Sequence, residues 1–374
     1  MMSVNKIKVL IVDDSALVRR MLSEMLGSDS QIEVVGTAED PFDAREKIKQ
    51  LNPDVITLDI EMPKMDGVTF LRNLMRLHPL PVVMVSSLTE KGADVTLAAL
   101  ELGAIDFVTK PKVNVGGSLN DYRQEIVEKI KMAAKVPMSR VERKTLSAAS
   151  PKPMVASVKP SATAAIPAKL SADAILSHNA VAKEKSRQRI IAIGASTGGT
   201  EAIREVLTAL PETMPPIVIT QHIPAAFSAP FAKRMDSMAA LSVHEAEDGQ
   251  LILPGHVYIA PGSHHLLIES VGGKLICRLH DGPPVNRHKP SVDVMFRSVA
   301  QVCGSNALGV LLTGMGDDGA RGLKELQQAS AKTIAQDEKT SVVWGMPGEA
   351  IKLGAADLVL PLSDVASKLL ALSK

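Results

Sequence analysis

The sequence contains few aromatic residues, with one Trp, two Tyr and six Phe among its 374 residues. Hydrophobic residues nevertheless make up 45% of the chain. Any core must therefore consist mainly of aliphatic side chains and methionine. We do not expect a binding surface that depends on aromatic stacking.

Cysteine is also scarce, and the sequence has neither an excess of charge of one sign nor a long apolar run. The two cysteines, Cys277 and Cys303, have neither CxxC nor metal-ligand spacing, which is typical of reduced residues in a reducing compartment. The 42 basic and 41 acidic residues nearly cancel, which argues against attraction to nucleic acid or anionic lipid.

The apolar run in MMSVNKIKVLIVDDS is short and ends in two aspartates, so it is neither a signal peptide nor a membrane span. We expect a cytoplasmic protein.

The length of the chain predicts more than one domain. In the first part, short aliphatic runs alternate with segments of helical period, a pattern that predicts an α/β fold with a doubly wound, five-stranded parallel (flavodoxin-like) sheet. The expected strands cover residues 8–12, 33–37, 54–58, 82–86 and 106–108.

From about residue 136 to 189 the composition changes to Ala, Ser, Pro and Lys, which favours a mobile tether. Strand signals then resume with IIAIG and IVIT and continue to LGVLLTG and DLVLPL. They predict a second α/β domain with a mostly parallel sheet, made mixed by a β-rich insertion. The predicted boundaries are 1–125 for the first domain, 126–187 for a helix end and flexible linker, and 188–374 for the second domain.

Polar residues follow the strands of the first domain. Asp13 and Asp14 end the first strand, Asp59 ends the third, Ser86 ends the fourth and Lys110 follows the fifth. The carboxyl ends of parallel strands share one edge of a sheet, so these groups should converge. Crowded carboxylates suit Mg²⁺, and Asp59 could accept a phosphoryl group whose oxygens Lys110 and the Ser86 hydroxyl would bind.

Residues 7–125 resemble the bacterial response-regulator receiver family through VLIVDDS, ITLDIEMPKMDG, VVMVSS and DFVTKP. The resemblance implies that a partner histidine kinase phosphorylates Asp59. It also implies that Asp13, Asp14, Asp59 and the Glu61 backbone carbonyl help to hold Mg²⁺. Phe107 matches the family's switch aromatic, although a simple core role is as well supported.

In the second domain, GASTG fits GxSxG, the turn that exposes a nucleophilic serine between a strand and a helix. Such a turn could equally bind a phosphate or a dinucleotide. His222 directly follows IVIT and could act as a base for Ser196, and Asp317 or Asp318 in GDDG could orient the imidazole. Each residue also has a structural interpretation, as a core histidine or a turn aspartate.

The chain order Ser, His, Asp differs from that of ordinary α/β-hydrolases, so that fold cannot be assumed. The other histidines show no convincing ligand geometry, and we expect them at the surface or in a pocket; they include His264, His265, His280 and His288.

Residues 188–372 resemble the chemotaxis methylesterases of the CheB type through GASTGGTEAI, QHIP, APG, HKPSVDVMFRS and LLTGMGDDGA. With a receiver and a linker in front, the chain is identified as a member of the chemotaxis response regulator protein-glutamate methylesterase family. The resemblance implies that Ser196 is the nucleophile, His222 the general base and acid, and Asp318 the orienting carboxylate. It places the oxyanion hole at the backbone amides of Thr197 and Met315.

The implied reaction is hydrolysis of glutamate γ-methyl esters on membrane chemoreceptors, with release of methanol, together with deamidation of receptor glutamines. No cofactor is expected for the esterase. The long linker suggests that the unphosphorylated receiver covers the esterase cleft. Two alternatives are an output domain that binds a nucleotide or phosphate, and a DNA-binding regulator, for which no basic recognition helix is visible.

Overall fold

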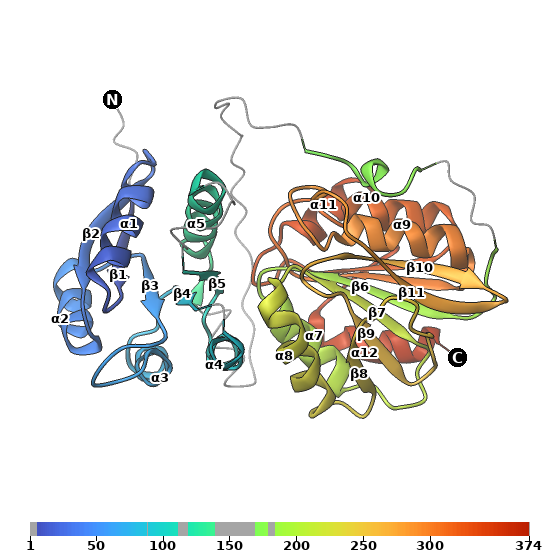
Figure 1. Cartoon of the computed structure of the whole chain (residues 1–374), viewed down its shortest axis with the longest axis horizontal. Coiled ribbons are helices and arrows are strands. Elements are labelled where there is room, and N and C mark those ends of the chain that lie inside the picture. Colours follow the sequence, from blue (N-terminus) through green and yellow to red (C-terminus); the bar gives the residue numbers. More distant parts are fainter. Residues whose placement is uncertain (1–5, 88, 111–118, 139–168, 179–183, 374) are drawn as a thin grey trace.

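The computed structural model describes residues 6–87, 89–110, 119–138, 169–178 and 184–373, which form two α/β units in contact (Figure 1). The predicted tether falls mostly on residues 139–168 and 179–183, which lie outside the described residues. Residues 169–178 are described, and they lie against the second unit. No helix in the described ranges is long and apolar enough to cross a membrane.

The first unit has the predicted five-stranded sheet, with every neighbouring pair of strands parallel in the order β2-β1-β3-β4-β5. Side chains cap its helices at Ser15, Asp40 and Asp66, whose oxygens accept backbone N–H groups of the first turn. Its elements are β1 (Ile7–Val12), α1 (Ala16–Gly27), β2 (Ile32–Ala38), α2 (Pro41–Leu51), β3 (Val55–Asp59), α3 (Gly67–Leu77), β4 (Val82–Ser86), α4 (Glu90–Glu101), β5 (Asp106–Thr109) and α5 (Leu119–Ala133).

The second unit begins with the short helix η1 (Ala172–Ala174) and then builds a seven-stranded sheet. Its further elements are β6 (Ile190–Ala195), α7 (Gly199–Thr208), β7 (Ile217–Gln221), α8 (Ala225–Asp236), β8 (Ser242–Glu245), β9 (His256–Ile259), β10 (His265–Val271), β11 (Lys274–His280), α9 (Val292–Cys303), η2 (Gly304–Asn306), β12 (Ala307–Leu311), α10 (Ala320–Gln328), β13 (Lys332–Gln336), α11 (Met346–Lys352), β14 (Leu358–Leu360) and α12 (Leu362–Leu372).

The expectation of a mixed sheet in the second unit is wrong for the described residues. The large sheet has the order β14-β13-β12-β6-β7-β9-β8, and all of its neighbouring strands are parallel. The β-rich insertion instead forms a separate antiparallel hairpin of β10 and β11. Alternating strand signals do not tell which sheet a strand joins, and here the hairpin packs against α9.

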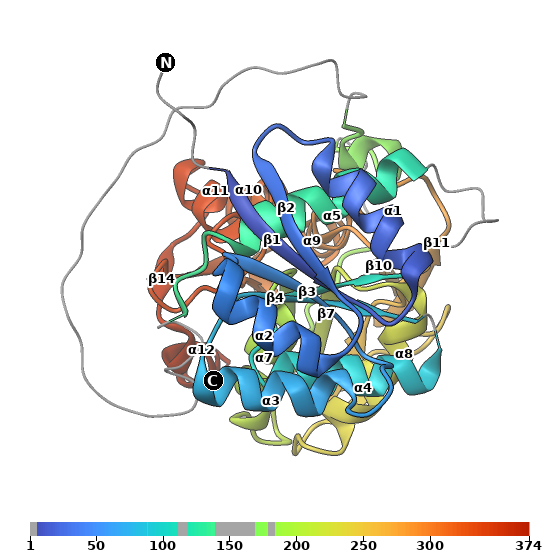
Figure 2. The ribbon, with the colours of Figure 1, turned by 90° about the vertical axis from the view of Figure 1, so that its left-hand side faces the viewer.

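The two units meet along α4, β5 and α5 of the first and the loops and helix α8 of the second. Figure 2 looks onto the first unit, with the second lying behind it. One cluster of buried apolar side chains runs through both units and includes Leu97 and Phe107 from the first and Phe227 from the second. The carboxyl ends of β6, β7 and β12, which carry the predicted second site, open towards the first unit.

Candidate active site and phosphorylation site

Ser196 lies in the tight turn between β6 and α7. Its N–H donates to the Thr313 carbonyl at 3.0 Å, and its own carbonyl accepts the Gly199 N–H at 2.7 Å. Gly198 has a φ of 74°, in the left-handed region, and a Cβ there would come within 2.7 Å of the Val342 side chain. The predicted turn of small residues is therefore required by both backbone conformation and space.

His222 follows β7 and contacts an aspartate from the loop after β12. Its Nε2 lies 2.8 Å from Asp318 Oδ2, and the two side chains are 8% and 0% exposed. Within the described residues, the other ring nitrogen, Nδ1, is buried without a hydrogen-bond partner. The carboxylate thus holds the imidazole at Nε2, while Nδ1 is available to bind a proton.

Asp318, and not its neighbour Asp317, is the aspartate that contacts His222. Asp317 pairs with Lys169 at 2.5 Å and is partly exposed. Asp318 Oδ1 accepts from the Asn286 amide and the Ser291 hydroxyl, both at 2.8 Å, and Oδ2 accepts the Val292 N–H at 2.7 Å. These donors hold the carboxylate in one orientation.

The surroundings of Asp318 also set its ionisation. Burial alone would raise the pKa of this carboxyl, but the hydrogen bond and charge of His222, the charge of His288 and the Asn286 amide outweigh burial and lower it. Nearby, burial and the charge of Asp318 raise the pKa of Asp293. Asp318 is therefore the ionised member of this buried acidic pair.

Ser196 and His222 line one cavity of about 1060 Å³, together with Thr197 and Met315, whose amides were predicted to form the oxyanion hole. The cavity also has walls from the first unit, including Phe107 and Lys129. Four of the sequence-predicted residues of the second site thus line one space between the two units, and the buried Asp318 contacts one of them, His222.

Gln221 was missed by sequence reasoning. Its side-chain amide donates to the Ser196 carbonyl at 2.9 Å and to the His222 carbonyl at 3.2 Å, so it links the loops that carry the two residues. Glutamine at a strand end has no distinctive sequence signal.

Of the other histidines, His288 lines the Ser196 cavity, as a surface or pocket position predicts, and His265 does not. His288 stacks on His222 with ring centroids 3.7 Å apart and planes 9° apart. Burial and the charge of His222 lower the pKa of His288. The prediction of a surface or pocket position is wrong for His265, which is 0% exposed and whose ring contacts the Pro283 carbonyl and the Ser291 N–H.

Contacts between the units reach the nucleophile turn itself. The Thr197 hydroxyl donates to Asp106 at the start of β5, and Phe107 packs on Phe227 with ring centroids 4.5 Å apart. Phe107 is therefore an interface residue as well as a core residue. Farther out, Arg234 of α8 pairs with Glu101 of α4 through two nitrogens.

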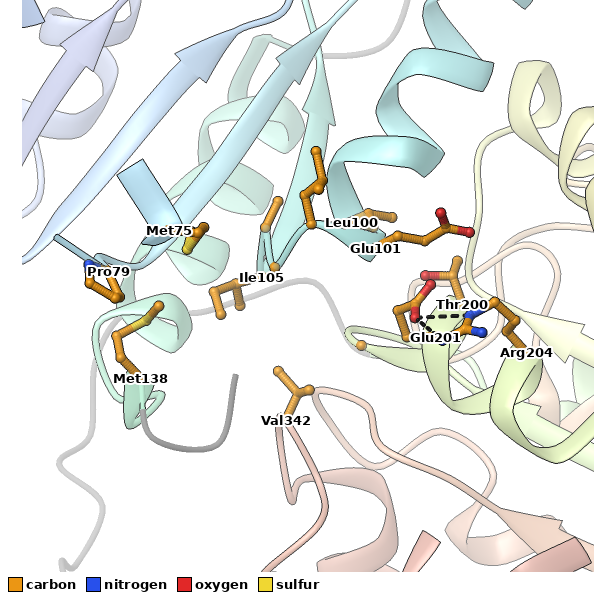
Figure 3. A pocket seen from close by; sticks show the side chains of 14 residues that line it. Met75, Pro79, Leu100, Glu101, Ile105, Met138, Thr200, Glu201, Arg204 and Val342 are labelled. Carbon is orange, nitrogen blue, oxygen red and sulfur yellow. Dashed lines mark hydrogen bonds and ion pairs between the residues drawn. The ribbon is translucent and has the colours of Figure 1, made fainter. Parts of the chain in front are cut away.

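A second, smaller cavity of about 130 Å³ lies beside this interface. Figure 3 shows Leu100 and Ile105 of the first unit on one side and Thr200, Glu201 and Arg204 of α7 on the other, with Val342 below. The two units thus leave space between them at this point of the interface as well.

The predicted phosphoryl acceptor Asp59 is 1% exposed at the end of β3. Lys110 Nζ lies 2.8 Å from Asp59 Oδ2 and 3.4 Å from Asp13 Oδ2. Burial raises the pKa of Asp59 to about 6, although the hydrogen bond from Lys110 opposes this shift. The acidic cluster and the lysine predicted from the sequence therefore lie together.

The residues of this pocket fit a divalent cation. Carboxylate oxygens of Asp13, Asp14 and Asp59 lie within 4.8 Å of one another, and Asp13 Oδ2 is buried without a hydrogen bond in the described chain. Such an all-oxygen set suits Mg²⁺. Glu61 is exposed beside it, and the Ser86 hydroxyl accepts a hydrogen bond from Thr96 at 2.7 Å and is not joined to Asp59.

Comparisons with known proteins agree with both units. Residues 9–115 match the family model described as response regulator receiver domain, and residues 191–369 match the one described as CheB methylesterase. The chain is 63% identical to a protein-glutamate methylesterase/protein-glutamine glutaminase of Hydrogenovibrio crunogenus, over 99% of this chain and 100% of that protein. It is 58% identical to one of Xanthomonas euvesicatoria, over 98% and 97% of the two chains.

The class defined by fold and site is a response-regulator receiver joined to a methylesterase-type α/β unit. The chain belongs to the protein-glutamate methylesterase/protein-glutamine glutaminase family. Among solved structures, the catalytic domain of the Thermotoga maritima CheB methylesterase is 40% identical, with a TM-score of 0.49 over 50% of this chain and 98% of that one.

Proposed function

We propose that this protein hydrolyses glutamate γ-methyl esters on chemoreceptors and deamidates receptor glutamines, and that phosphorylation of its receiver activates it. The observation that carries the proposal is the imidazole of His222, held by Asp318 at 2.8 Å, with a free Nδ1 at the cavity that Ser196 lines. The names of the related proteins indicate the substrate class. The geometry of Ser196, His222 and Asp318 supports a nucleophilic serine assisted by a histidine base.

In the first step, the Ser196 hydroxyl attacks the ester carbonyl while His222 takes its proton at Nδ1, the nitrogen that does not face Asp318. The amides of Thr197 and Met315 are our candidates for stabilising the oxyanion. His222 then protonates the leaving methoxide, so methanol departs and an acyl-serine remains. The ionised Asp318 stabilises the imidazolium between these transfers.

In the second step, His222 takes a proton from water as the water oxygen attacks the acyl-serine. His222 then gives this proton to the departing Ser196 oxygen, and the carboxylic acid product ionises as it leaves. A glutamine side chain follows the same route, because only the leaving group changes from methanol to ammonia. Gln221 keeps the backbone of both reacting loops in register through its two hydrogen bonds.

Regulation begins at Asp59, which we propose accepts a phosphoryl group from a histidine kinase. Asp13, Asp14, Asp59 and the Glu61 carbonyl would hold Mg²⁺, which offsets the charge of the phosphoryl oxygens when bound. Lys110 is already 2.8 Å from Asp59. The Ser86 hydroxyl now donates to the Ser87 and Gly92 carbonyls and would have to turn away from them to donate to those oxygens.

We propose that the unphosphorylated receiver blocks the entry of receptor helices. Asp106, Phe107 and Lys129 line the Ser196 cavity from the side of the receiver, and Asp106 accepts a hydrogen bond from Thr197, the residue next to the nucleophile. Phosphorylation would weaken this interface and allow the units to separate while the chain between them keeps them close.

The test follows methanol release from methylated receptor membranes, with and without a small-molecule phosphodonor. Ser196→Ala should lose hydrolysis and keep phosphorylation at Asp59, whereas Asp59→Ala should keep the basal rate and lose the response to the donor. Turnover that persists in Ser196→Ala would place the nucleophile elsewhere.

A further inference from the structure

Residues 169–178, which the sequence assigns to the mobile linker, lie along the second unit beside α9 and α10 (Figure 1, green). We call this segment the strap. It begins at Lys169, on the rim of the Ser196 cavity, and ends at His178, which lies 3.4 Å from Glu325 of α10. Its contacts are those of a folded element and not of a tether.

Apolar side chains fix the middle of the strap. Ala172, Leu267, Val285 and Val294 form a buried cluster, against which Ile175 and Leu176 of the strap pack. The fit to the second unit is close, because a Cβ at Gly282 would come within 2.2 Å of Ile175 Cδ1.

Polar contacts fix the strap to α9. Arg297, whose side chain is 8% exposed, donates from Nη1 to Asp173 Oδ1 at 2.9 Å and to the Leu176 carbonyl at 2.8 Å. The rest of its guanidinium pairs with Glu325. Gln301, one turn farther along, donates to the Ser177 carbonyl at 2.9 Å.

The strap also reaches the residues that support the active site. Leu170 accepts, through its carbonyl, the N–H of Asn286 at 2.9 Å. Asn286 and Arg287 both have positive φ, of 50° and 71°, and form the tip of a tight turn between Val285 and His288. Val285 and His288 hydrogen-bond to each other through their backbones. The N–H of Asn286 therefore has no partner within the turn and needs one from another segment.

This turn supplies two direct supports of the catalytic pair. The Asn286 side chain donates to Asp318 at 2.8 Å, and His288 stacks on His222. A shift of the turn would therefore move Asn286, which binds Asp318, and His288, which stacks on His222, at the same time.

We propose that the strap is a working part of the esterase, which positions the turn at residues 285–288 and through it the His222–Asp318 pair. Strap residues touch no reacting atom, so they are positioning residues. This inference rests on the proposed function. It also places the start of the catalytic unit at about residue 169, ahead of the predicted boundary at 188.

The experiment uses the full chain with Mg²⁺ and beryllofluoride, so that closure by the receiver does not limit the rate. Asp173→Ala with Ile175→Ala loosens the strap from its own side. Arg297→Met is a second variant, which leaves the strap sequence unchanged and removes the polar contacts of Arg297 to the strap and to Glu325. Ala174→Ser changes an exposed strap residue and serves as the matched control. Ester hydrolysis, its pH profile and the rate of Ser196 labelling by a fluorophosphonate are measured alongside the melting temperature.

Misplacement of a catalytic group by about 1 Å can cost about 100-fold in rate. We expect the double variant to lower kcat by about 10- to 100-fold with little change in KM, to slow labelling in parallel and to shift the pH profile. Arg297→Met should show a smaller loss in kcat, and Ala174→Ser should match the wild type.

A lowered melting temperature with unchanged kcat, labelling and pH profile in both variants would make the strap a stabilising segment only and overturn the proposal. If the double variant fails to fold, Arg297→Met alone decides, by the same readouts. A wild-type protein that shows no labelling dependent on Ser196 would instead refute the proposed function, so the two failures are distinct.

Discussion

Glu101 in α4 and Arg234 in α8 form an ion pair across the interface, away from both Ser196 and Asp59. The guanidinium contacts the carboxylate through Nε at 2.8 Å and through Nη2, and the two side chains are 28% and 29% exposed. Replacing Glu101 with Ala should weaken the closed arrangement without touching either site, and so raise the esterase rate of the unphosphorylated protein.

The size of the effect follows from the geometry. Exposed ion pairs contribute roughly 0.2–1 kcal/mol, and a two-point guanidinium–carboxylate contact with partly buried side chains belongs at about the upper end. If the open form is a minor population, about 1 kcal/mol raises it about 5-fold. We expect Glu101→Ala and Arg234→Ala each to raise the basal rate about 3- to 5-fold and to leave the phosphorylated rate unchanged.

The assay is methanol release from methylated receptor membranes before and after addition of beryllofluoride with Mg²⁺. The double variant should be no more active than either single variant, since both remove the same contact, and the charge swap Glu101→Arg with Arg234→Glu should restore part of the repression. Glu46→Ala removes a more exposed pair with Lys49 outside the interface and serves as control. Basal rates equal to wild type in both single variants would refute occlusion by this interface.

Asp318→Asn should lower kcat by about 10⁴-fold and leave KM unchanged, because this is the loss seen when the orienting carboxylate of a serine hydrolase becomes an amide. Steady-state kinetics measure both constants. A loss of kcat under 10-fold would assign the role of orienting acid to another residue. The pKa of Asp318 in the folded protein lies below the value of about 4 of an unfolded aspartate. Its ionised form therefore stabilises the fold above that pH, and this stabilisation is lost as the pH falls. In urea unfolding between about pH 5 and 2, the free energy of unfolding should decline less steeply in Asp318→Asn than in wild type. Gly198→Ala places a side chain on a residue with left-handed backbone conformation beside Val342, which should lower the free energy of unfolding by roughly 1–3 kcal/mol. Both the melting temperature and the rate of fluorophosphonate labelling should fall. A variant in which neither changes would show that the turn relaxes freely. Asp13→Asn should abolish Mg²⁺-dependent phosphorylation while basal hydrolysis persists, and normal phosphate incorporation would exclude Asp13 from the metal site.

The first unit was predictable because its central strands, such as β3 and β4, are aliphatic runs that are buried on both faces, and polar residues follow where these runs end. The expected strand at residues 106–108 is β5, Asp106–Thr109, and the acidic pocket follows from the parallel topology. Ser196, His222 and Asp318 were also within reach, since each directly follows an aliphatic strand or its short loop.

The supports of the second site were beyond sequence reasoning. Asn286 and His288 come from a loop after the hairpin, with no strand-end signal, and only tertiary packing brings them to His222 and Asp318. The contacts of the strap are equally hard to predict, because its few apolar residues, among them Ile175 and Leu176, stand between small and polar ones and show no sustained period. Its order comes from Arg297, Asn286 and Gly282 of the second unit, which no local pattern predicts.

Asp318 lies at the amino end of α9 and accepts two of that helix's first N–H groups, from Val292 at 2.7 Å and Asp293 at 3.3 Å. The positive end of the helix macrodipole therefore acts on this carboxylate at all times, whether the imidazole is charged or neutral. During turnover His222 gains and loses a proton twice, yet the acid next to it has a second, constant source of positive potential. A helix that takes no part in the reaction thus helps to keep Asp318 ionised between cycles, which favours transfer of the His222 proton to the leaving group or back to Ser196 over its transfer to Asp318.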